Sequence, residues 1–373
     1  MHANARTAPI IFKVRLAFTD LIRDRKVLYD PKTSAVAVRP AVTYEEYYAI
    51  TGKPGSDKLA PFSSVCDVDH LYTSNGKMIC PTFSLPAGPI QFGGTCVASD
   101  ALYDLDRVSF PLADGTKATV SIRAEQGEER RRGLEKVGVK GASGDWVCNK
   151  CYALSGNFTL PSVILKNVIV LRWVEERIAR GTLARDLVES IRYQHDYLDR
   201  VVQGALKNGR DLVESTIPHP SYFRLHDSGD FYRPEYFEAW CEVAEAFPTI
   251  RFWASTRAWA VPSLWKQFMR CHVPKNLVIR PSGLFMGDGA LKENSSLQLA
   301  AGSQIQTTRD FKAGVRVPGR VYHCPATYSK THTCQHAEGD YAGRDDRNKK
   351  IAWPTGCRFC WDAPSRPVVY KEH

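Results

Sequence analysis

The sequence SYFRLHDSGDF, residues 221–231, decides the predicted fold. Its first half is rich in aromatic and apolar residues, which is typical of a short buried strand, and Gly229 indicates the turn through which the chain leaves that strand. Residues 234–247 follow with apolar side chains at helical spacing, and Pro234 suits the first turn of a helix. This stretch therefore predicts a strand, a turn and a helix, in that order.

The same alternation continues along the chain. Residues 250–256 (IRFWAST) and 276–280 (NLVIR) predict two further strands, and residues 263–270 predict the helix between them. Strands that alternate with helices form βαβ units, whose strands are parallel and are covered by the helices. Right-handed crossovers place the carboxyl ends of such strands at one edge of the sheet. We therefore expect the stretches HDSGD and STRAW, which follow two of the strands, to form a functional edge.

Other segments complete the predicted elements. Apolar residues recur at helical spacing over residues 161–181 and again over 183–208, so we predict two long helices there. Residues 106–122 predict a β-hairpin. The charged residues 123–145 indicate either a solvated surface segment or a basic arm that contacts a polyanion.

We divide the chain into three parts on this basis. Residues 1–95, which are rich in Pro, Ser and Gly, are predicted to be an N-terminal extension packed on the core. Residues 96–320 form the predicted α/β core, with an insertion at about 101–145. Residues 321–373 form a cysteine-rich C-terminal segment that a bound metal would order.

The composition, with 43% hydrophobic and 24% charged residues, is ordinary for a soluble globular protein. No apolar run approaches the roughly 20 residues that a membrane-spanning helix needs, and the first residues do not have the pattern of a signal peptide. We therefore expect a cytoplasmic protein without a membrane partner. The net charge of +10 favours contact with a polyanion, and nucleic acid is the candidate partner.

Eleven cysteines are many for a cytoplasmic chain. In a reducing compartment, clustered cysteines indicate metal ligands rather than disulfides. The C-terminal group has the pattern C-x9-C-x22-C-x2-C and consists of Cys324, Cys334, Cys357 and Cys360. Four thiolates satisfy either a zinc ion or a 4Fe–4S cluster, and the spacing does not decide between the two.

A second group includes the CxxC motif of Cys148 and Cys151. Its natural third member is Cys96, which follows two glycines that suit a close turn around a metal; Cys80 is a candidate fourth ligand and Cys66 a weaker one. Three thiolates on a 4Fe–4S cluster would leave one iron open for a cofactor or substrate, whereas a fourth would close it. The alternatives are a closed zinc site and a thioredoxin-like dithiol.

The order of the motifs resembles a known family. In sequence order these motifs are CNKCYALSGNF (148–158), RLHDSGDFYRPEYFEAW (224–240), RFWASTRAW (251–259) and CRFCW (357–361). They are similar to the gene-product-eighty-eight-type proteins of phages and plasmids, which look like distant relatives of the radical S-adenosylmethionine (radical SAM) enzymes. The resemblance implies an α/β fold with a partial or full parallel (β/α) barrel, TIM-like, and a metal-bound C-terminal segment.

This resemblance covers roughly residues 78–100 and 146–373. It implies one or two 4Fe–4S clusters, S-adenosylmethionine as a cofactor, and an electron donor such as flavodoxin or ferredoxin. The metal ligands that it implies are Cys96, Cys148, Cys151, Cys324, Cys334, Cys357 and Cys360. The compact three-cysteine loop of the radical enzymes is absent, because a hairpin and a charged segment separate Cys96 from Cys148.

The resemblance also suggests roles for polar residues near the strand ends. The catalytic candidates are His226, Asp230 and Arg257, and the cofactor-binding candidates are Tyr152, Asp227, Ser228 and Gly229. A carboxylate there would accept the cofactor amine, Arg257 would hold a carboxylate or phosphate, and Tyr152 would pack against the adenine. Each has a structural alternative: His226 as a core histidine, Asp230 as a helix cap and Arg257 as an ion-pair partner.

We therefore expect an iron–sulfur enzyme of the radical SAM type that modifies nucleic acid or a nucleotide, in the host cytoplasm if the protein is phage-encoded. Two alternatives stay open. One is a non-catalytic zinc protein of a mobile element that binds DNA. The other is an electron-transfer iron–sulfur protein whose clusters are closed.

Overall fold

The computed structural model of the chain describes residues 10–52, 67–68, 71–73, 80–99, 107–111, 117–121, 148, 151–208, 221–283, 305–308, 322–323, 360 and 368–371. Cys66, Cys324, Cys334 and Cys357 lie outside the described residues. The same is true of the charged segment 123–145.

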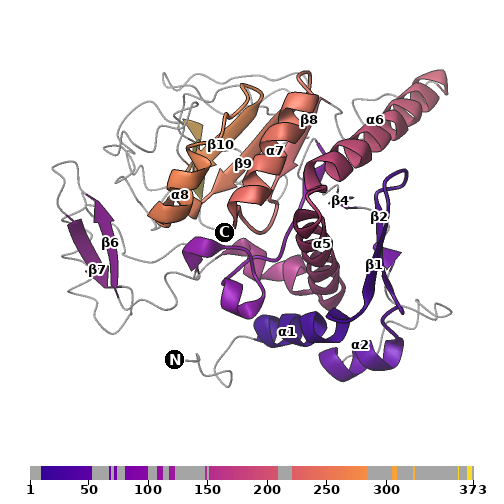
Figure 1. Cartoon of the computed structure of the whole chain (residues 1–373), viewed down its shortest axis with the longest axis horizontal. Coiled ribbons are helices and arrows are strands. Elements are labelled where there is room, and N and C mark those ends of the chain that lie inside the picture. Colours follow the sequence, from indigo (N-terminus) through magenta and orange to yellow (C-terminus); the bar gives the residue numbers. More distant parts are fainter. Residues whose placement is uncertain are drawn as a thin grey trace.

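A five-stranded sheet forms the centre of the described structure (Figure 1). Its order is β10 (Leu277–Pro281), β9 (Arg251–Thr256), β8 (Tyr222–Leu225), β5 (Thr82–Phe83) and β4 (Tyr72–Thr73). β10, β9, β8 and β5 run parallel, whereas β4 pairs antiparallel with β5. The strands that the structure describes form an open sheet, so the TIM-like barrel stays a prediction.

Helices α7 (Pro234–Ala246) and α8 (Pro262–Phe268) connect these strands in the order β8–α7–β9–α8–β10, which is the alternation that the sequence predicts. α7 covers one face of the sheet. Its fully buried Trp240 ring lies 5.3 Å from the Phe83 ring and 5.8 Å from the Phe223 ring, measured between centroids. This packing removes apolar surface from water and fixes α7 over β5 and β8.

Two long helices precede β8, namely α5 (Pro161–Ala179) and α6 (Leu183–Lys207). Their bounds match the prediction, since Pro161 opens α5 and Gly181, with φ +65°, lies in the turn before α6. Among the described helices, none is by itself long and apolar enough to cross a membrane, although the bent pair Tyr152–Thr159 and Pro161–Ala179 meets the length and composition criteria together.

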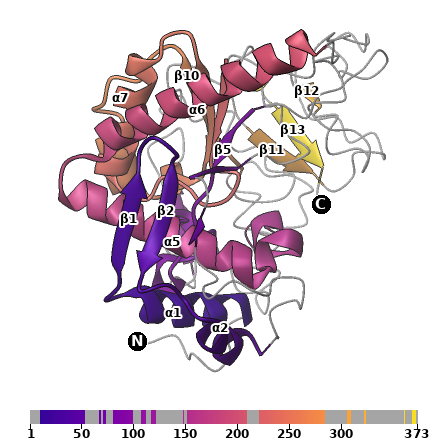
Figure 2. The same cartoon turned by 90° about the vertical axis from the view of Figure 1, so that its right-hand side faces the viewer.

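The N-terminal segment packs on α5. Its elements are α1 (Ile10–Ile22), β1 (Lys26–Asp30), β2 (Ala35–Arg39), α2 (Tyr44–Thr51) and β3 (Asp67–Val68). α1 lies beneath α5 in Figure 2, and its Phe12 and Phe18 side chains are buried in the common core. β4 and β5 also fall within residues 1–95. β5 pairs with β8 and β4 pairs with β5, so the main sheet takes two strands from the segment that the sequence predicts to be an extension.

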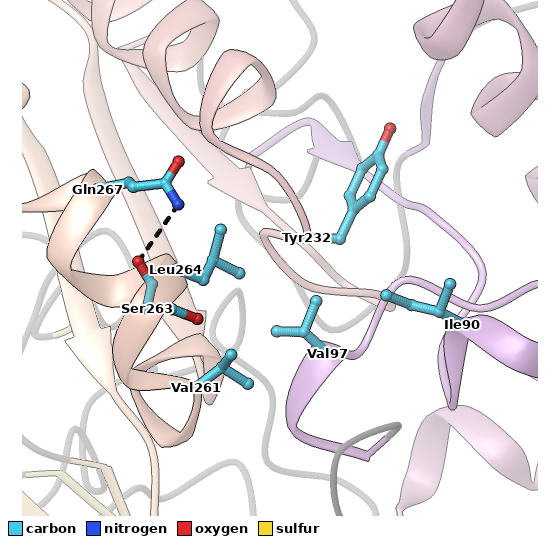
Figure 3. Close-up of a pocket in the computed structure, with 7 residues that line it drawn as sticks. All are labelled: Ile90, Val97, Tyr232, Val261, Ser263, Leu264 and Gln267. Atoms are coloured by element: carbon cyan, nitrogen blue, oxygen red, sulfur yellow. Dashed lines mark hydrogen bonds between the residues drawn. The ribbon is translucent and has the colours of Figure 1, made fainter.

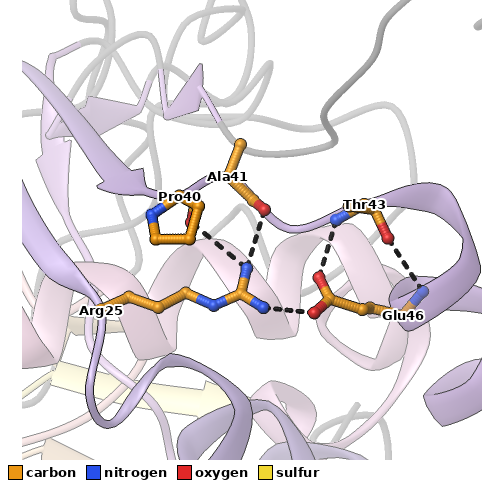
Figure 4. Close-up of polar contacts among 5 residues, drawn as sticks. All are labelled: Arg25, Pro40, Ala41, Thr43 and Glu46. Carbon is orange, nitrogen blue, oxygen red and sulfur yellow. Dashed lines mark hydrogen bonds and ion pairs between the residues drawn. The ribbon is translucent and has the colours of Figure 1, made fainter.

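Arg25 holds the connection between β2 and α2 (Figure 4). Its guanidinium donates to the carbonyl oxygens of Pro40 at 3.2 Å and Ala41 at 2.8 Å, and pairs with Glu46. The Glu46 carboxylate accepts from the Thr43 N–H at 2.9 Å, and Thr43 Oγ1 accepts from the Glu46 N–H at 3.3 Å. This capping box satisfies backbone groups at the first turn of α2 and fixes where that helix begins.

Two smaller sheets complete the described elements. β6 (Arg107–Pro111) and β7 (Lys117–Ser121) form the antiparallel hairpin that the sequence predicts. β11 (Ile305–Thr308), β13 (Val368–Lys371) and β12 (Tyr322–His323) pair in parallel. The second sheet therefore joins the end of the predicted core to the predicted C-terminal segment.

Candidate functional site

Polar groups from the ends of β8 and β9 meet at Asp230. The Asp230 carboxylate accepts hydrogen bonds from Thr256 Oγ1 at 2.6 Å, the Phe231 N–H at 2.7 Å and the Arg257 N–H at 2.8 Å. The Asp230 N–H donates to Thr95 Oγ1 at 3.1 Å. Asp230 therefore ties the carboxyl ends of two parallel strands to the segment that precedes Cys96.

The environment of Asp230 disfavours its charged form. Burial raises the pKa of Asp230 to about 6, although the three hydrogen bonds to its carboxylate act in the opposite direction. Asp230 does not cap α7, because that helix begins after Arg233. Its contacts instead hold the two strand ends together.

We expect the stability that Asp230 contributes to fall as the pH rises from about 4 to about 6. The unfolded chain loses this proton near the ordinary Asp pKa of 3.8, whereas the folded protein keeps it to about 6. Proton release therefore favours unfolding across this window, by up to about 3 kcal/mol. Urea unfolding of the wild type and of Asp230→Asn between pH 4 and 7 measures the effect. The variant should lack this part of the decline, and identical pH slopes would contradict the assignment.

Arg257 lies at the carboxyl end of β9. Its Nε donates to the Gly283 carbonyl oxygen, just beyond β10, at 2.9 Å. Burial acts to lower the pKa of Arg257, but the negative potential of Cys148, Cys151 and Cys96 contributes to a net increase. Arg257 is therefore a half-buried cation whose charge interacts with Asp230 and with all three cysteines.

Cys96 ends a tight turn that begins at Pro86 and contains the 3-10 helix η2 (Ile90–Phe92). The Gly88 N–H donates to Cys96 Sγ at 3.2 Å, and the Cys96 N–H donates to the Gly88 carbonyl oxygen at 3.0 Å. Gly94 passes so close to this carbonyl that a Cβ there would lie 2.1 Å from the Gly88 oxygen. Only glycine at position 94 lets the turn close around the Cys96 thiol.

Cys148 and Cys151 form a local turn. The Cys151 N–H donates to the Cys148 carbonyl oxygen at 3.4 Å, and the 3-10 helix η5 (Tyr152–Leu154) begins directly afterwards. Leu154 Cδ2 would lie 3.4 Å from a Cβ built on Gly88, so η5 packs against the turn that carries Cys96. This contact brings the two halves of the predicted first cysteine group together.

We call Cys96, Cys148 and Cys151 the cysteine trio. Burial raises the pKa of each of these thiols, to about 12 for Cys148. At Cys96 the charges of Asp230, Cys151 and Cys148 add to the increase, so the trio and Asp230 share one electrostatic environment. Within the described part of the chain, no three His, Cys, Asp or Glu side chains are close enough together to hold one metal ion.

Cys80 lies within electrostatic range of Cys360. Cys80 is fully buried just before β5; burial raises its pKa, and the charged groups that act on its thiol include Arg224, Asp227 and Cys360. The carbonyl oxygen of Cys360 accepts a hydrogen bond from Arg280 Nε, on β10, at 3.0 Å. The charge of one member of the predicted C-terminal cysteine group therefore acts on the candidate fourth ligand Cys80.

Tyr152, which directly follows the CxxC motif, anchors η5 to the end of β8. Its hydroxyl donates to the Asp227 carbonyl oxygen at 2.6 Å and accepts from Arg224 Nη2 at 3.0 Å. Arg224 also forms an ion pair with the Asp227 carboxylate at 3.0 Å and lies 4.9 Å from the centroid of the Trp253 ring. Two of the four predicted cofactor-binding residues, Tyr152 and Asp227, therefore belong to one network that positions the CxxC motif.

His226 lies in the aromatic core. β8 ends at Leu225, and His226 has a left-handed backbone with φ +62°. Its Nε2 shares a hydrogen bond with the Tyr236 hydroxyl at 2.9 Å, and its ring meets the Phe231 ring edge-on at 4.5 Å between centroids. Burial, with the nearby Arg224 charge, lowers the pKa of His226 to about 3, so the ring is neutral near pH 7. These contacts are those of a core histidine.

Ser228 and Gly229 fix the turn after β8. Ser228 Oγ donates to the Leu85 carbonyl oxygen at 2.6 Å, and the Leu85 N–H donates to the Ser228 carbonyl oxygen at 2.9 Å. Gly229 has φ +87°, and a Cβ there would lie 2.7 Å from Thr95 Oγ1. The two residues thus hold the β8 turn against the segments after β5, which include the turn of Cys96.

A pocket with a volume of about 350 Å³ is lined in part by Val97, the residue that follows Cys96 (Figure 3). Ile90 and Val97 line one side, and Val261 and Leu264, at α8, line the other. The polar side chains of Tyr232, Ser263 and Gln267 also line the pocket, which is open to solvent. The sequence contains no pattern that predicts this pocket, because its walls come from distant segments.

The site contains further residues that the sequence analysis does not select. Thr256 stands inside the quoted motif RFWASTRAW, Thr95 directly precedes Cys96, and both bind Asp230. Arg15, on α1, is buried and donates to the Ala87 carbonyl oxygen within the turn of Cys96. The threonines could have been found by their places beside the predicted site residues, whereas Arg15 stands in a segment without a motif.

The model of the Gene product 88 family matches residues 66–363 of the chain. The chain belongs to the Gene product 88 family. A stretch of 38 residues is 47% identical to the Gene 88 protein of Mycobacterium phage D29; it covers 10% of this chain and 16% of the phage protein. No solved structure matches the chain. The matched family region includes the cysteine trio, Asp230 and Arg257, and the phage relative supports the predicted phage context of this Gene product 88 protein.

Proposed function

We propose that this Gene product 88 protein is an iron–sulfur enzyme of the radical SAM type that acts on nucleic acid or a nucleotide. One observation supports the proposal most directly: the half-buried cysteine trio lies within electrostatic range of Asp230 and Arg257 at the carboxyl ends of parallel strands. Functional groups of α/β proteins gather at this end of the strands. A partial barrel that includes β5, β8, β9 and β10 is part of the same proposal.

The donor set fits an iron–sulfur cluster. Thiolates are the ligands of such clusters, and Cys96, Cys148 and Cys151 would hold one. A cluster spreads its ligands over several iron atoms, so it suits thiols that are neighbours without being in mutual contact. Arg257 supplies positive charge beside this anionic group. When bound, the cluster and S-adenosylmethionine would supply the reductive cleavage of a carbon–sulfur bond, which protein side chains do not provide.

The residues of the chain have positioning roles in this proposal. Asp230 Oδ2 accepts a hydrogen bond from the Arg257 N–H, and Asp230 Oδ1 accepts one from the Thr256 hydroxyl. These bonds fix the end of β9 beside the trio. The Tyr152 hydroxyl binds the Asp227 carbonyl oxygen and fixes the CxxC motif against β8. Arg257 would bind a carboxylate or phosphate of a ligand at this edge.

Charge supports the choice of substrate class. The chain carries a net charge of +10, which favours a polyanionic or phosphate-bearing substrate. An electron donor such as flavodoxin or ferredoxin would supply the electron in the host cytoplasm. The C-terminal cysteines would hold a second cluster or a zinc ion.

Metal analysis tests the proposal first. Protein purified without oxygen should be brown and should contain iron and acid-labile sulfide. Colourless protein that contains zinc alone would instead favour the zinc-binding, DNA-binding alternative.

Cofactor turnover is the second test. Reduced protein incubated with S-adenosylmethionine should form 5′-deoxyadenosine, measured by chromatography. Iron–sulfur protein that forms none would favour the electron-transfer alternative, in which both clusters are closed.

A further inference from the structure

Arg15 is a buried cation whose charge partner is not a carboxylate of the described structure. It lies on α1 and is 3% exposed. In the part of the chain that the structure describes, Arg15 forms no ion pair with Asp or Glu, and its Nε has no hydrogen-bond partner. A guanidinium taken out of water is costly unless negative charge compensates it. The position of Arg15 therefore indicates a nearby anion.

One peptide unit links Arg15 to Cys96. Arg15 Nη1 donates to the Ala87 carbonyl oxygen, and the N–H of the same peptide unit, at Gly88, donates to Cys96 Sγ at 3.2 Å. A hydrogen bond to the carbonyl end of a peptide polarises its N–H end and strengthens the next bond in the chain. The guanidinium thus acts on the sulfur through a single peptide group.

The turn keeps this arrangement rigid. The Arg15 side chain lies against Gly93, where a Cβ would be 3.4 Å from Arg15 Cδ, and Gly94 closes on the Gly88 carbonyl oxygen. The Arg15 guanidinium carbon also lies 5.4 Å from the centroid of the Phe12 ring. Because these contacts hold the Arg15 guanidinium in place, it loses little conformational freedom when it forms the hydrogen bond that polarises the peptide.

We propose that Arg15 is a positioning residue for the cysteine trio, which strengthens the hydrogen bond from Gly88 to Cys96 Sγ and makes the group bound there easier to reduce. This inference rests on the proposed function, since it needs a reducible cluster on the trio. Hydrogen bonds to cysteine sulfur and nearby positive charge stabilise the reduced, more negative cluster. Arg15 thereby sets the potential at which the site accepts an electron.

Two substitutions separate charge from packing. Arg15→Gln keeps a donor for the Ala87 carbonyl oxygen but removes the charge, whereas Arg15→Lys keeps the charge. In dye-mediated redox titrations of the iron-loaded protein, Arg15→Gln should lower the equilibrium constant for reduction about tenfold, which is about 59 mV for a one-electron couple. Arg15→Lys should stay close to the wild type. Arg25→Gln is the matched control, because Arg25 also binds backbone carbonyls but lies at the β2–α2 connection, and it should change stability without changing the potential.

Cluster retention provides a second readout that does not need turnover. A reduced cluster on three thiolates is anionic, so after reconstitution with iron and sulfide Arg15→Gln should lose its cluster absorption to a chelator about tenfold faster than the wild type. Cys96→Ser identifies the part of the signal that comes from the trio.

The outcomes distinguish the two proposals. Unchanged potential and unchanged cluster retention in folded Arg15→Gln would overturn the inference and leave the proposed function standing. A lower potential in a protein that forms no 5′-deoxyadenosine would support the role of Arg15 and overturn the proposed function. A wild-type protein that acquires no cluster, or whose metal signals are the same in Cys96→Ser, would overturn both.

Discussion

Replacing Cys148 by Ala is expected to reduce the formation of 5′-deoxyadenosine to background and to leave most of the fold intact. The thiol is one of three that would hold the cluster, and without it the trio cannot supply three ligands. The fold should survive because the main core consists of α5, α7 and the sheet rather than of the CxxC turn. The measurements are product formation with S-adenosylmethionine, iron content and circular dichroism.

Cys241→Ala is the matched control for this prediction. Cys241 is buried on α7 among apolar core residues, so its loss should lower stability modestly and leave iron content unchanged.

Cys360→Ala should instead reduce solubility, because the C-terminal group is predicted to order its segment by binding metal. Equal loss of folding from Cys148→Ala and Cys360→Ala would indicate two structural sites and would contradict a catalytic trio.

Gly94→Ala is expected to destabilise the protein by about 3 kcal/mol or more and to abolish iron binding. The new Cβ would lie 2.1 Å from the Gly88 oxygen and 2.9 Å from the Pro89 oxygen, and both are backbone atoms that cannot rotate away. Relief of this overlap requires the turn to open, which moves Cys96 away from Cys148 and Cys151. Chemical denaturation and iron analysis measure the two effects.

Gly204→Ala is the control for a glycine substitution as such. Gly204 stands within α6, and a Cβ there would meet nothing within 4 Å. Alanine in a helix interior is more stable than glycine by roughly 0.5–1 kcal/mol, so this variant should gain stability and keep its iron. If Gly94→Ala also increased stability, the turn of Cys96 would not have this closed form.

The alternation of strands and helices was predictable from local patterns. Apolar spacing together with Pro161 and Pro234 locates the start of α5 and of α7, and these helices lie where the sequence predicts them. β5 was not predictable, because it has only two residues and is held by pairing with β8, which is distant in the sequence. α1 and α2 also lie in a segment whose composition contains few helix signals.

The candidate site was predictable only in part. The CxxC motif is local, so Cys148 and Cys151 are neighbours by necessity, whereas the approach of Cys96 depends on long-range packing of η5 on its turn. Strand periodicity suggests that His226 and Ser228 share one face, but β8 ends at Leu225 and the backbone of His226 is left-handed, so the alternation of a strand does not extend to them. Arg15 reaches the site through the packing of α1, which no motif encodes.

The distribution of the site along the chain has a consequence for biosynthesis. Its parts come from α1, the turn of Cys96, the CxxC motif and the ends of β8 and β9. A nascent chain therefore cannot assemble the full set until residue 257 has left the ribosome. Any ion or cluster that requires all of these groups is therefore acquired only after about two thirds of the 373 residues have been synthesised.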